Sequence, residues 1–276
     1  MTMNKEAQMN QKSNYTWCMY KMKLTSSLFL SLLFLGHFSF AQDEKATKLI
    51  DGKTGEQIIR EYEYWSGIKD DWPNLGHYRE ANANLQQPAA NENRVVFMGN
   101  SITEGWIETS PEFFEGKPYI DRGISGQTTP QMLIRFRPDV IDLKPKVVVL
   151  LCGVNDIAQN TGPSTLEMIE GNIASMAELA QVNGIKVILC SVLPAYDFPW
   201  KPGLEPAEKI ITLNKWIKEY ASKNGFIYLD YFSSMADERN GLPAIYSEDG
   251  VHPNKAGYKV MEGLVEEAIA RFLATE

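Results

Sequence analysis

Five short apolar segments lie along the chain from Arg94 onward, and each has the composition of a β-strand. The third of them, residues 146–153, is a continuous apolar run, which is typical of a central parallel strand that is covered on both faces. Between these segments, apolar residues recur every three or four positions, and this spacing predicts amphipathic helices. The predicted strands are residues 94–100, 119–124, 146–153, 186–194 and 225–232, and the predicted helices are residues 163–182, 206–222 and 254–273.

The alternation of strand and helix predicts an α/β fold. Strands that are joined by intervening helices form a parallel sheet, and the helices cover both of its faces. No internal repeat or low-complexity segment interrupts the pattern. We therefore expect one domain, residues 94–276, with an open parallel sheet between two layers of helices.

The first 41 residues have the pattern of a targeting segment. Lys21 and Lys23 precede an apolar run at residues 28–35, and a small-x-small ending follows at residues 39–41. This arrangement is typical of a secretory signal peptide, and the run is short for a membrane span. An uncleaved anchor is the alternative. We predict that residues 1–41 are an N-terminal extension with a signal peptide, that cleavage follows Ala41, and that the protein is secreted or periplasmic.

Residues 42–93 are polar and aromatic and contain few aliphatic side chains, so we expect one or two helices that pack on the main domain. The charge of the chain narrows its partners. The net charge is −8, and residues 1–41 carry four lysines and one glutamate, which leaves −11 beyond Ala41. A strongly acidic protein is a poor candidate for binding nucleic acid or an anionic membrane, and we expect no stable membrane insertion after cleavage.

Cysteine and acidic residues give no sign of a metal or cofactor site. Cys152 and Cys190 lie in apolar strands without a CxxC motif or a Cys/His cluster, so we interpret them as buried free thiols. The acidic residues that could suggest a metal site have a spacing that matches no metal-binding loop. These residues are Glu104, Asp156, Glu248 and Asp249. We expect no metal and no cofactor.

The polar residues of greatest interest follow the predicted strands. In an open α/β sheet, ligands bind beyond the carboxyl ends of the strands. Four of the five strands are followed by groups suited to acyl transfer, and these are Ser101, Gly126, Asn155 and the pair Asp249 and His252. The sequence therefore places the candidate chemistry at one edge of the sheet.

The small number of histidines limits the choice of a catalytic base. Of the three histidines, His37 lies in the predicted signal peptide and His77 in the aromatic segment before the domain, which leaves His252 at the sheet edge. A serine hydroxyl becomes a strong nucleophile when an imidazole takes its proton, and the imidazole needs a partner on its other ring nitrogen. Asp249 can be that partner if the Asp-Gly-Val-His turn folds back. Ser101 is the candidate nucleophile, although the letters GNS alone are equally compatible with a serine that caps the next helix.

Ester hydrolysis also needs hydrogen-bond donors for the oxyanion of the tetrahedral intermediate. The backbone N–H groups of Ser101 and Gly126 and the side-chain amide of Asn155 are candidates. Taken singly, Gly126 is also compatible with an ordinary turn, and Asn155 with a loop or a helix cap. Their order and placement together are more specific than any of them alone.

This ordered set resembles the SGNH hydrolases, also called the GDSL-like lipase/acylhydrolase family. The four blocks are FMGNSITEGW, RGISGQTT, CGVNDI and DGVHPNKAGY, and the letters of the family name fall on Ser101, Gly126, Asn155 and His252. The resemblance implies a flavodoxin-like three-layer α/β/α sandwich with a five-stranded parallel sheet. It implies Ser101 as the nucleophile, His252 as the base and Asp249 as the residue that orients the base. It also implies an oxyanion hole formed by Ser101, Gly126 and Asn155.

Asn100 departs from the family pattern, which often has aspartate before the serine. This position is not the acid of the triad, so we expect the activity to be kept. We expect the departure to change the hydrogen bonding of the turn and the local charge near Ser101.

Together these features predict an exported serine esterase that cleaves short acyl esters, in particular acetyl esters, of carbohydrates. Aromatic residues near the sheet edge, among them Trp106, Tyr196 and Trp200, favour a rim that stacks on a sugar ring, although packing in the core or in loops is the alternative for each. Lysophospholipase, lipase or thioesterase activity on lipid acyl esters would use the same residues, and so would acyl transfer to an acceptor sugar. A non-catalytic exported glycan-binding protein is a further alternative, but it would not need the complete serine, histidine and aspartate set. The sequence does not determine the oligomeric state.

Overall fold

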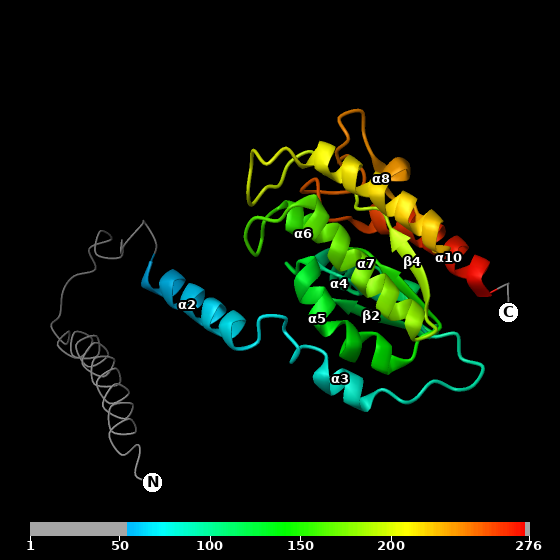
Figure 1. Ribbon diagram of the computed structural model, residues 1–276. Coiled ribbons are helices and arrows are strands. Elements are labelled where there is room, and N and C mark those ends of the chain that lie inside the picture. Colours follow the sequence, from blue (N-terminus) through cyan, green and yellow to red (C-terminus); the bar gives the residue numbers. More distant parts are fainter. Residues whose placement is uncertain (1–53, 274–276) are drawn as a thin grey trace, which may run out of the picture. The chain divides into compact units, whose positions relative to one another are not determined.

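The computed structural model of the protein describes residues 54–273 (Figure 1). The predicted signal peptide lies outside the described residues. The chain divides into two compact units, residues 1–63 and residues 64–276, and the second contains the sheet. Helix α2 (Gly55–Asp70) begins in the first unit and ends in the second.

The described residues form one sheet of five parallel strands in the order β2-β1-β3-β4-β5. Each strand falls within an apolar segment that the sequence predicts. Strands β1 and β3 are buried along their whole length, as expected of central strands that are covered on both faces. The strands are β1 (Val95–Gly99), β2 (Tyr119–Gly123), β3 (Val147–Leu150), β4 (Lys186–Cys190) and β5 (Ile227–Leu229).

Helices cover both faces of the sheet, which confirms the three-layer α/β/α sandwich (Figure 1). Helix α7 packs between α5 and α8 on one face, and α10 packs against α4 on the other. The two faces receive different helices because crossovers between parallel strands are right-handed. The chain moves in one direction across the sheet from β1 to β2, so α4 covers one face. It moves in the other direction from β2 to β5, so α5, α7 and α8 cover the other face. The longer helices are α4 (Ser101–Thr109), α5 (Thr129–Asp139), α7 (Leu166–Val182), α8 (Pro206–Asn224) and α10 (Lys255–Leu273). The short elements are α3 (Arg79–Asn84), α6 (Val154–Ile157), α9 (Phe232–Met235) and the 3₁₀ turns η1 (Pro111–Phe113) and η2 (Ile141–Leu143).

One side chain that the sequence places on the rim of the site lies in the core instead. Trp106 is 1% exposed, and its ring stacks on Phe113 and Tyr258 and meets Phe97 edge-on. Ile102 lies in the same helix as Trp106, and its backbone oxygen accepts a hydrogen bond from the hydroxyl of Tyr258 over 2.9 Å. Trp106 therefore holds α4 against the sheet and cannot contact a substrate.

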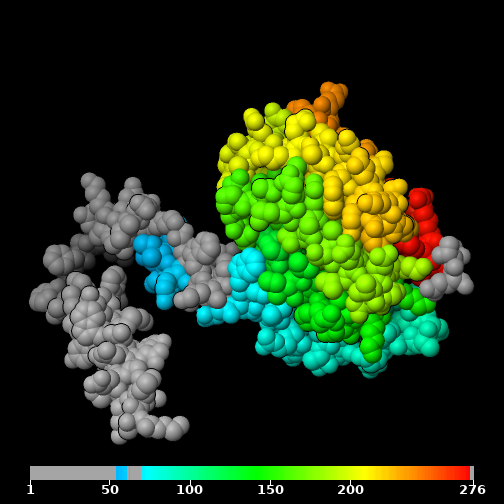
Figure 2. All heavy atoms as spheres, viewed as in Figure 1, coloured from blue at the N-terminus to red at the C-terminus, as the bar shows by residue number. Residues whose placement is uncertain are grey.

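The segment that leads from α2 to β1 lies along the main domain. Figure 2 shows it in cyan beside the green residues of α5. Asn82 of α3 donates hydrogen bonds to the backbone oxygen of Pro138 and to the side chain of Asp139, at distances of 3.1 and 2.7 Å. The side chain of Gln131 donates to the backbone oxygen of Trp72 over 2.7 Å. Residues 72–82 are therefore tied to α5 at several points.

Two further features of the described residues bear on the sequence predictions. Cys152 and Cys190 are both buried and free, as the sequence predicts. Within residues 54–273, no helix is both long and apolar enough to cross a membrane.

Candidate active site

Ser101 lies at the junction of β1 and α4, where it is the first residue of the helix. The cap of α4 is Asn100, whose side-chain oxygen accepts a hydrogen bond from the backbone N–H of Ile102 over 3.1 Å. Asn100 therefore performs the capping role that the sequence left open for Ser101. Ser101 is half-buried, and its hydroxyl is not needed to cap the start of the helix, so it is available to a partner outside the helix.

That partner is His252. The Oγ atom of Ser101 lies 3.0 Å from Nε2 of His252, and Nδ1 of the same ring lies 2.7 Å from Oδ2 of Asp249. The three residues thus form one hydrogen-bonded line, although Ser101 and His252 are separated by 151 positions in the chain. The structure brings together the three side chains that the sequence singles out for this chemistry.

The loop before α10 folds back on itself through Asp249. Oδ1 of Asp249 accepts hydrogen bonds from the backbone N–H groups of Val251 and His252, at 2.9 and 2.8 Å, and from the hydroxyl of Ser247 at 3.1 Å. This leaves Oδ2 free to meet the imidazole. Burial alone would raise the pKa of the Asp249 carboxyl, but the hydrogen bonds from His252 and Val251 outweigh it and lower the pKa to about 2. Asp249 is therefore a carboxylate at any pH near neutrality.

Gly123, the last residue of β2, brings a second loop against the start of α4. A Cβ atom at this position would lie 2.1 Å from the backbone nitrogen of Glu104, so only glycine permits the approach. Three residues later, Gly126 is exposed and has a φ of +76°, a conformation that side chains other than glycine rarely adopt. No acceptor among the described residues bonds the backbone N–H of Gly126 or that of Ser101. Both donors are thus unused.

Asn155, the third candidate donor, lies beside this loop. Asn155 is 3% exposed, and its side-chain amide donates one hydrogen bond to the backbone oxygen of Gln127, 2.9 Å away. The second N–H of that amide is bonded to no described residue. Asn155 therefore lies next to Gly126 in space, although β3 separates the two in the chain.

Asp156 fixes the turn that carries Asn155. Its carboxylate accepts hydrogen bonds from the backbone N–H and the hydroxyl of Thr129, the first residue of α5. Burial is the largest influence on the pKa of the Asp156 carboxyl and raises it. The hydrogen bonds from Thr129 act in the opposite direction, and the resulting pKa is about 6. Asp156 is thus occupied in joining two loops of the site.

Glu104, which was considered from the sequence only as a metal ligand, is a further residue of this site. It lies three residues after Ser101 in α4, so both side chains are on the same side of the helix. Its Oε2 atom accepts hydrogen bonds from the backbone N–H of Ser125, at 2.9 Å, and from the hydroxyl of Ser125. The i+3 spacing from the serine is the signal that could have identified it.

His77 lies beside Glu104, with 3.6 Å between its Nε2 atom and Oε1 of the carboxylate. Both side chains are partly exposed, and such pairs contribute little to stability. We expect a His77→Ala variant to keep kcat/KM for p-nitrophenyl acetate within about twofold of wild type, because His77 is not the base. Loss of turnover in a folded His77→Ala protein would contradict the choice of His252.

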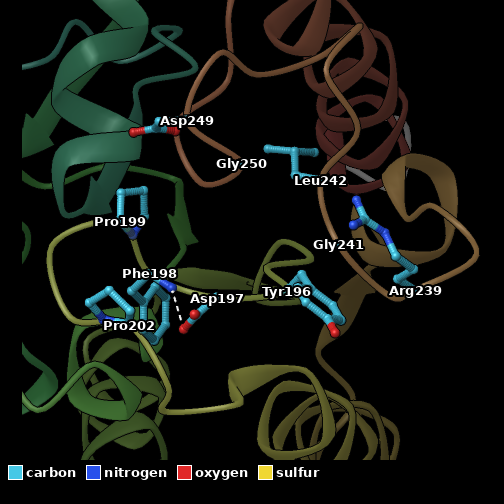
Figure 3. Close-up of a pocket in the computed structure, with 10 residues that line it drawn as sticks. All are labelled: Tyr196, Asp197, Phe198, Pro199, Pro202, Arg239, Gly241, Leu242, Asp249 and Gly250. Carbon is cyan, nitrogen blue, oxygen red and sulfur yellow. Dashed lines mark hydrogen bonds between the residues drawn. The ribbon is translucent and has the colours of Figure 1, made fainter.

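The two other aromatic residues that the sequence places on the rim are exposed. The ring of Trp200 lies 5.9 Å from that of His252 and stacks on Phe198. Tyr196 lines a neighbouring pocket of about 260 Å³, together with Arg239, Leu242 and Asp249. Figure 3 shows Tyr196 and Asp249 on opposite sides of this pocket. An exposed aromatic surface therefore adjoins the histidine.

Metal-ligating residues do not gather in the part of the chain that the structure describes. No group of three or more His, Cys, Asp or Glu side chains there is placed to hold a metal ion. The acidic residues near the site are instead bound to Thr129, Ser125 and His252.

The chain is similar to known esterases and lipases in sequence and in fold. The model of the GDSL-like lipase/acylhydrolase family matches residues 97–260. A GDSL-like lipase of Bacteroides thetaiotaomicron, known from its crystal structure, is 50% identical, and the match covers 73% of this chain and 99% of that chain with a TM-score of 0.71. An acetylxylan esterase of Xylanibacter ruminicola is 26% identical over 66% of this chain and 44% of its own length. Esterase TesA of Pseudomonas aeruginosa is 31% identical over 61% of this chain and 83% of its own length. The chain spans less than half the length of two of the curated relatives that it matches.

Proposed function

The chain belongs to the GDSL-like lipase/acylhydrolase family and is a carboxylic ester hydrolase, and from this we propose its substrate and mechanism. We propose that the protein removes short acyl groups from carbohydrate esters by a serine mechanism. The observation that carries the proposal is the hydrogen-bonded line from Asp249 through His252 to Ser101. It joins a nucleophile, a base and an orienting carboxylate at the carboxyl edge of a parallel sheet.

The first half of the reaction forms an acyl-enzyme. The hydroxyl oxygen of Ser101 attacks the ester carbonyl carbon while Nε2 of His252 takes the hydroxyl proton. The carbonyl oxygen becomes an oxyanion, which accepts hydrogen bonds from the backbone N–H groups of Ser101 and Gly126 and from the amide of Asn155. Asp249 holds the proton on Nδ1, so that Nε2 is the basic nitrogen. The imidazolium then gives its proton to the leaving alcohol, and the C–O bond to the alcohol breaks.

The second half releases the acid. Water attacks the acyl carbon while His252 takes one of its protons, and a second oxyanion forms in the same hole. His252 returns the proton to Oγ as the bond between Ser101 and the acyl group breaks. The free carboxylic acid leaves, and the enzyme regains its starting state.

Two observations support a carbohydrate ester with a short acyl group. The exposed ring of Trp200 lies beside His252, where the alcohol part of the ester leaves, and a flat aromatic face is a suitable platform for a sugar ring. The acetylxylan esterase of Xylanibacter ruminicola is a relative whose name states such an activity. The predicted signal peptide adds an exported location, secreted or periplasmic, to the proposal.

The proposal is tested by comparing substrates. We expect hydrolysis of p-nitrophenyl esters to be fastest for the acetyl ester and to fall from C2 to C8, and acetate to be released from acetylated xylo-oligosaccharides. Faster hydrolysis of the C8 ester or of a lysophospholipid would replace the carbohydrate substrate with a lipid one. Binding of oligosaccharides without any turnover would favour the glycan-binding alternative, and product that depends on an added sugar alcohol would favour acyl transfer.

Replacement of Trp200 tests the aromatic platform. We expect Trp200→Ala to lower kcat/KM for an acetylated oligosaccharide about fivefold more than kcat/KM for p-nitrophenyl acetate, because stacking contributes about 1 kcal/mol. Trp200→Phe keeps an aromatic face and is the control, with most of the preference retained. An unchanged ratio in Trp200→Ala would remove Trp200 from the binding site.

A further inference from the structure

The loop that carries Gly126 is held by residues that precede the part of the chain matched by the family model. That match begins at residue 97. The hydroxyl of Tyr78 donates a hydrogen bond to the backbone oxygen of Gly123 over 2.5 Å, and the backbone N–H of Gly123 donates to Oδ1 of Asp121 over 2.7 Å. Both backbone polar groups of Gly123 are thus bonded, one of them by a residue 45 positions earlier.

The other end of the loop is held by the same early segment. The side chain of Gln127 donates a hydrogen bond to the backbone oxygen of Pro73 over 2.7 Å. Gln127 is 3% exposed, and its side-chain oxygen accepts from Arg135 over 2.5 Å. Its backbone oxygen accepts the amide of Asn155. One residue therefore joins the early segment to an oxyanion donor.

The middle of the loop is fixed from α4. Glu104 binds the backbone N–H and the hydroxyl of Ser125, as described above. Gly126 follows directly, and its own N–H is bonded to no described residue. The loop is thus anchored at Gly123, Ser125 and Gln127, and the unused donor lies between these anchors.

Tyr78 is itself held in place. The guanidinium of Arg122 lies 4.5 Å from the centre of the Tyr78 ring, and its Nε and Nη2 atoms donate to Oδ1 of Asn82 over 2.9 and 2.7 Å. Asn82 is bonded in turn to α5. The hydroxyl of Tyr78 is therefore presented to Gly123 by a fixed side chain.

From these contacts we propose that Pro73 and Tyr78 hold the loop that carries Gly126, and that Tyr78 is a positioning residue for the oxyanion hole. Tyr78 acts through the carbonyl of Gly123, which sets the direction of the chain that leads to Gly126. A donor in an oxyanion hole typically contributes about 10²–10³ in rate, and a misplacement of about 1 Å can cost about 10². The inference rests on the proposed function, since it assigns Gly126 a role in that reaction.

The test is the variant Tyr78→Phe, which removes the hydroxyl and keeps the ring beside Arg122. We expect kcat for p-nitrophenyl acetate to fall about 10- to 100-fold with little change in KM, because the donor stabilises the transition state more than the bound substrate. We also expect backbone amide hydrogen exchange in residues 123–128 to become about fivefold faster, as for the loss of one hydrogen bond.

Tyr119→Phe is the matched control. Tyr119 is the first residue of β2, at the opposite end of the strand from Gly123, and its half-buried hydroxyl donates to Glu266 over 3.0 Å. This variant should keep wild-type kcat and wild-type exchange in residues 123–128. Equal kcat and equal exchange in the two variants would overturn the proposal.

The exchange measurement separates this inference from the proposed function. If the wild-type protein hydrolyses no ester, or if Ser101→Ala keeps its turnover, the proposed function is wrong. Even then, faster amide exchange in Tyr78→Phe than in Tyr119→Phe would establish that Tyr78 holds the loop. Equal exchange in the two variants would refute that role of Tyr78.

Discussion

Replacing Ser101 with alanine is expected to lower kcat by up to about 10⁶-fold while the protein remains folded, because the group that forms the acyl-enzyme is lost. The residual rate would come from the oxyanion hole and from substrate binding. Alanine is a good residue for the first turn of a helix, and the cap of α4 is Asn100, so the variant should fold. The measurement is steady-state hydrolysis of p-nitrophenyl acetate, with circular dichroism to verify the fold.

Ser175→Ala is the matched control for this experiment. Ser175 is a helical serine in α7 whose hydroxyl bonds only the backbone oxygen of Gly171 among the described residues. This variant should keep wild-type turnover. Near-wild-type activity in Ser101→Ala would show that another group is the nucleophile.

Replacing Asp249 with asparagine should lower kcat by about 10⁴-fold, with the geometry of the loop kept. The side-chain oxygen of asparagine can still accept the backbone N–H groups of Val251 and His252 that Oδ1 now accepts. The NH₂ group would then face Nδ1 of His252 in place of Oδ2. An NH₂ group donates a hydrogen bond to Nδ1, so it favours the tautomer in which Nε2 carries the proton and cannot act as the base.

The pH dependence follows from the same contacts. The pKa of Asp249 is about 2, below its usual value of 3.8, so the fold favours the ionised form. The stability that Asp249 contributes is therefore present above about pH 4 and is lost as the pH falls towards 2. Because Asp249 stays ionised at higher pH, its titration does not shape the rate profile there.

Asp237→Asn is the control for Asp249→Asn. Asp237 also accepts backbone hydrogen bonds in a nearby loop, from Arg239 and Gly241, and hydrogen bonds likewise lower the pKa of its carboxyl. It has no contact with His252 among the described residues, so kcat should stay within about twofold of wild type. Equal kcat for Asp249→Asn and Asp237→Asn would mean that the carboxylate does not orient the base.

The strands and the longest helices could be predicted because their apolar pattern continues over several turns or over a whole buried strand. The extents of helices α4 and α5 were not predicted, although a helix that begins near Ser101 was considered. Helix α4 has nine residues, and α5 contains Pro138 and a start at Thr129-Pro130 that resembles a loop. Their helical form depends on packing against the sheet, which a local pattern does not contain.

Trp106 illustrates why closeness in the chain was a poor guide to the rim of the site. The sequence places it five residues after Ser101, near the sheet edge. In a helix, five residues correspond to a rotation of about 140° from the starting side chain. The side of α4 that carries Ser101 faces the site, so Trp106 faces the core, as does Ile102 one turn earlier.

The candidate triad could be selected from the sequence because histidine is scarce and the polar residues follow strands of a parallel sheet. The i+3 spacing of Glu104 from Ser101 was a signal that the sequence contained. Tyr78 was not selected, because its contact depends on how loops meet in the fold. The hydroxyl of Tyr78 donates a hydrogen bond to a backbone oxygen 45 positions later in the chain, and no local sequence pattern predicts such a bond. A positioning role of this kind is visible only when the loop around Gly126 is seen in three dimensions.

The central claim is that Ser101 is an activated nucleophile. A fluorophosphonate reagent bonds covalently to such a serine, so peptide mapping by mass spectrometry after its reaction with the wild-type protein is the most direct measurement. We expect one adduct, on Ser101, that is absent from Ser101→Ala and forms much more slowly in a His252→Ala variant. An adduct on another residue, or no adduct on a folded protein that hydrolyses esters, would contradict it.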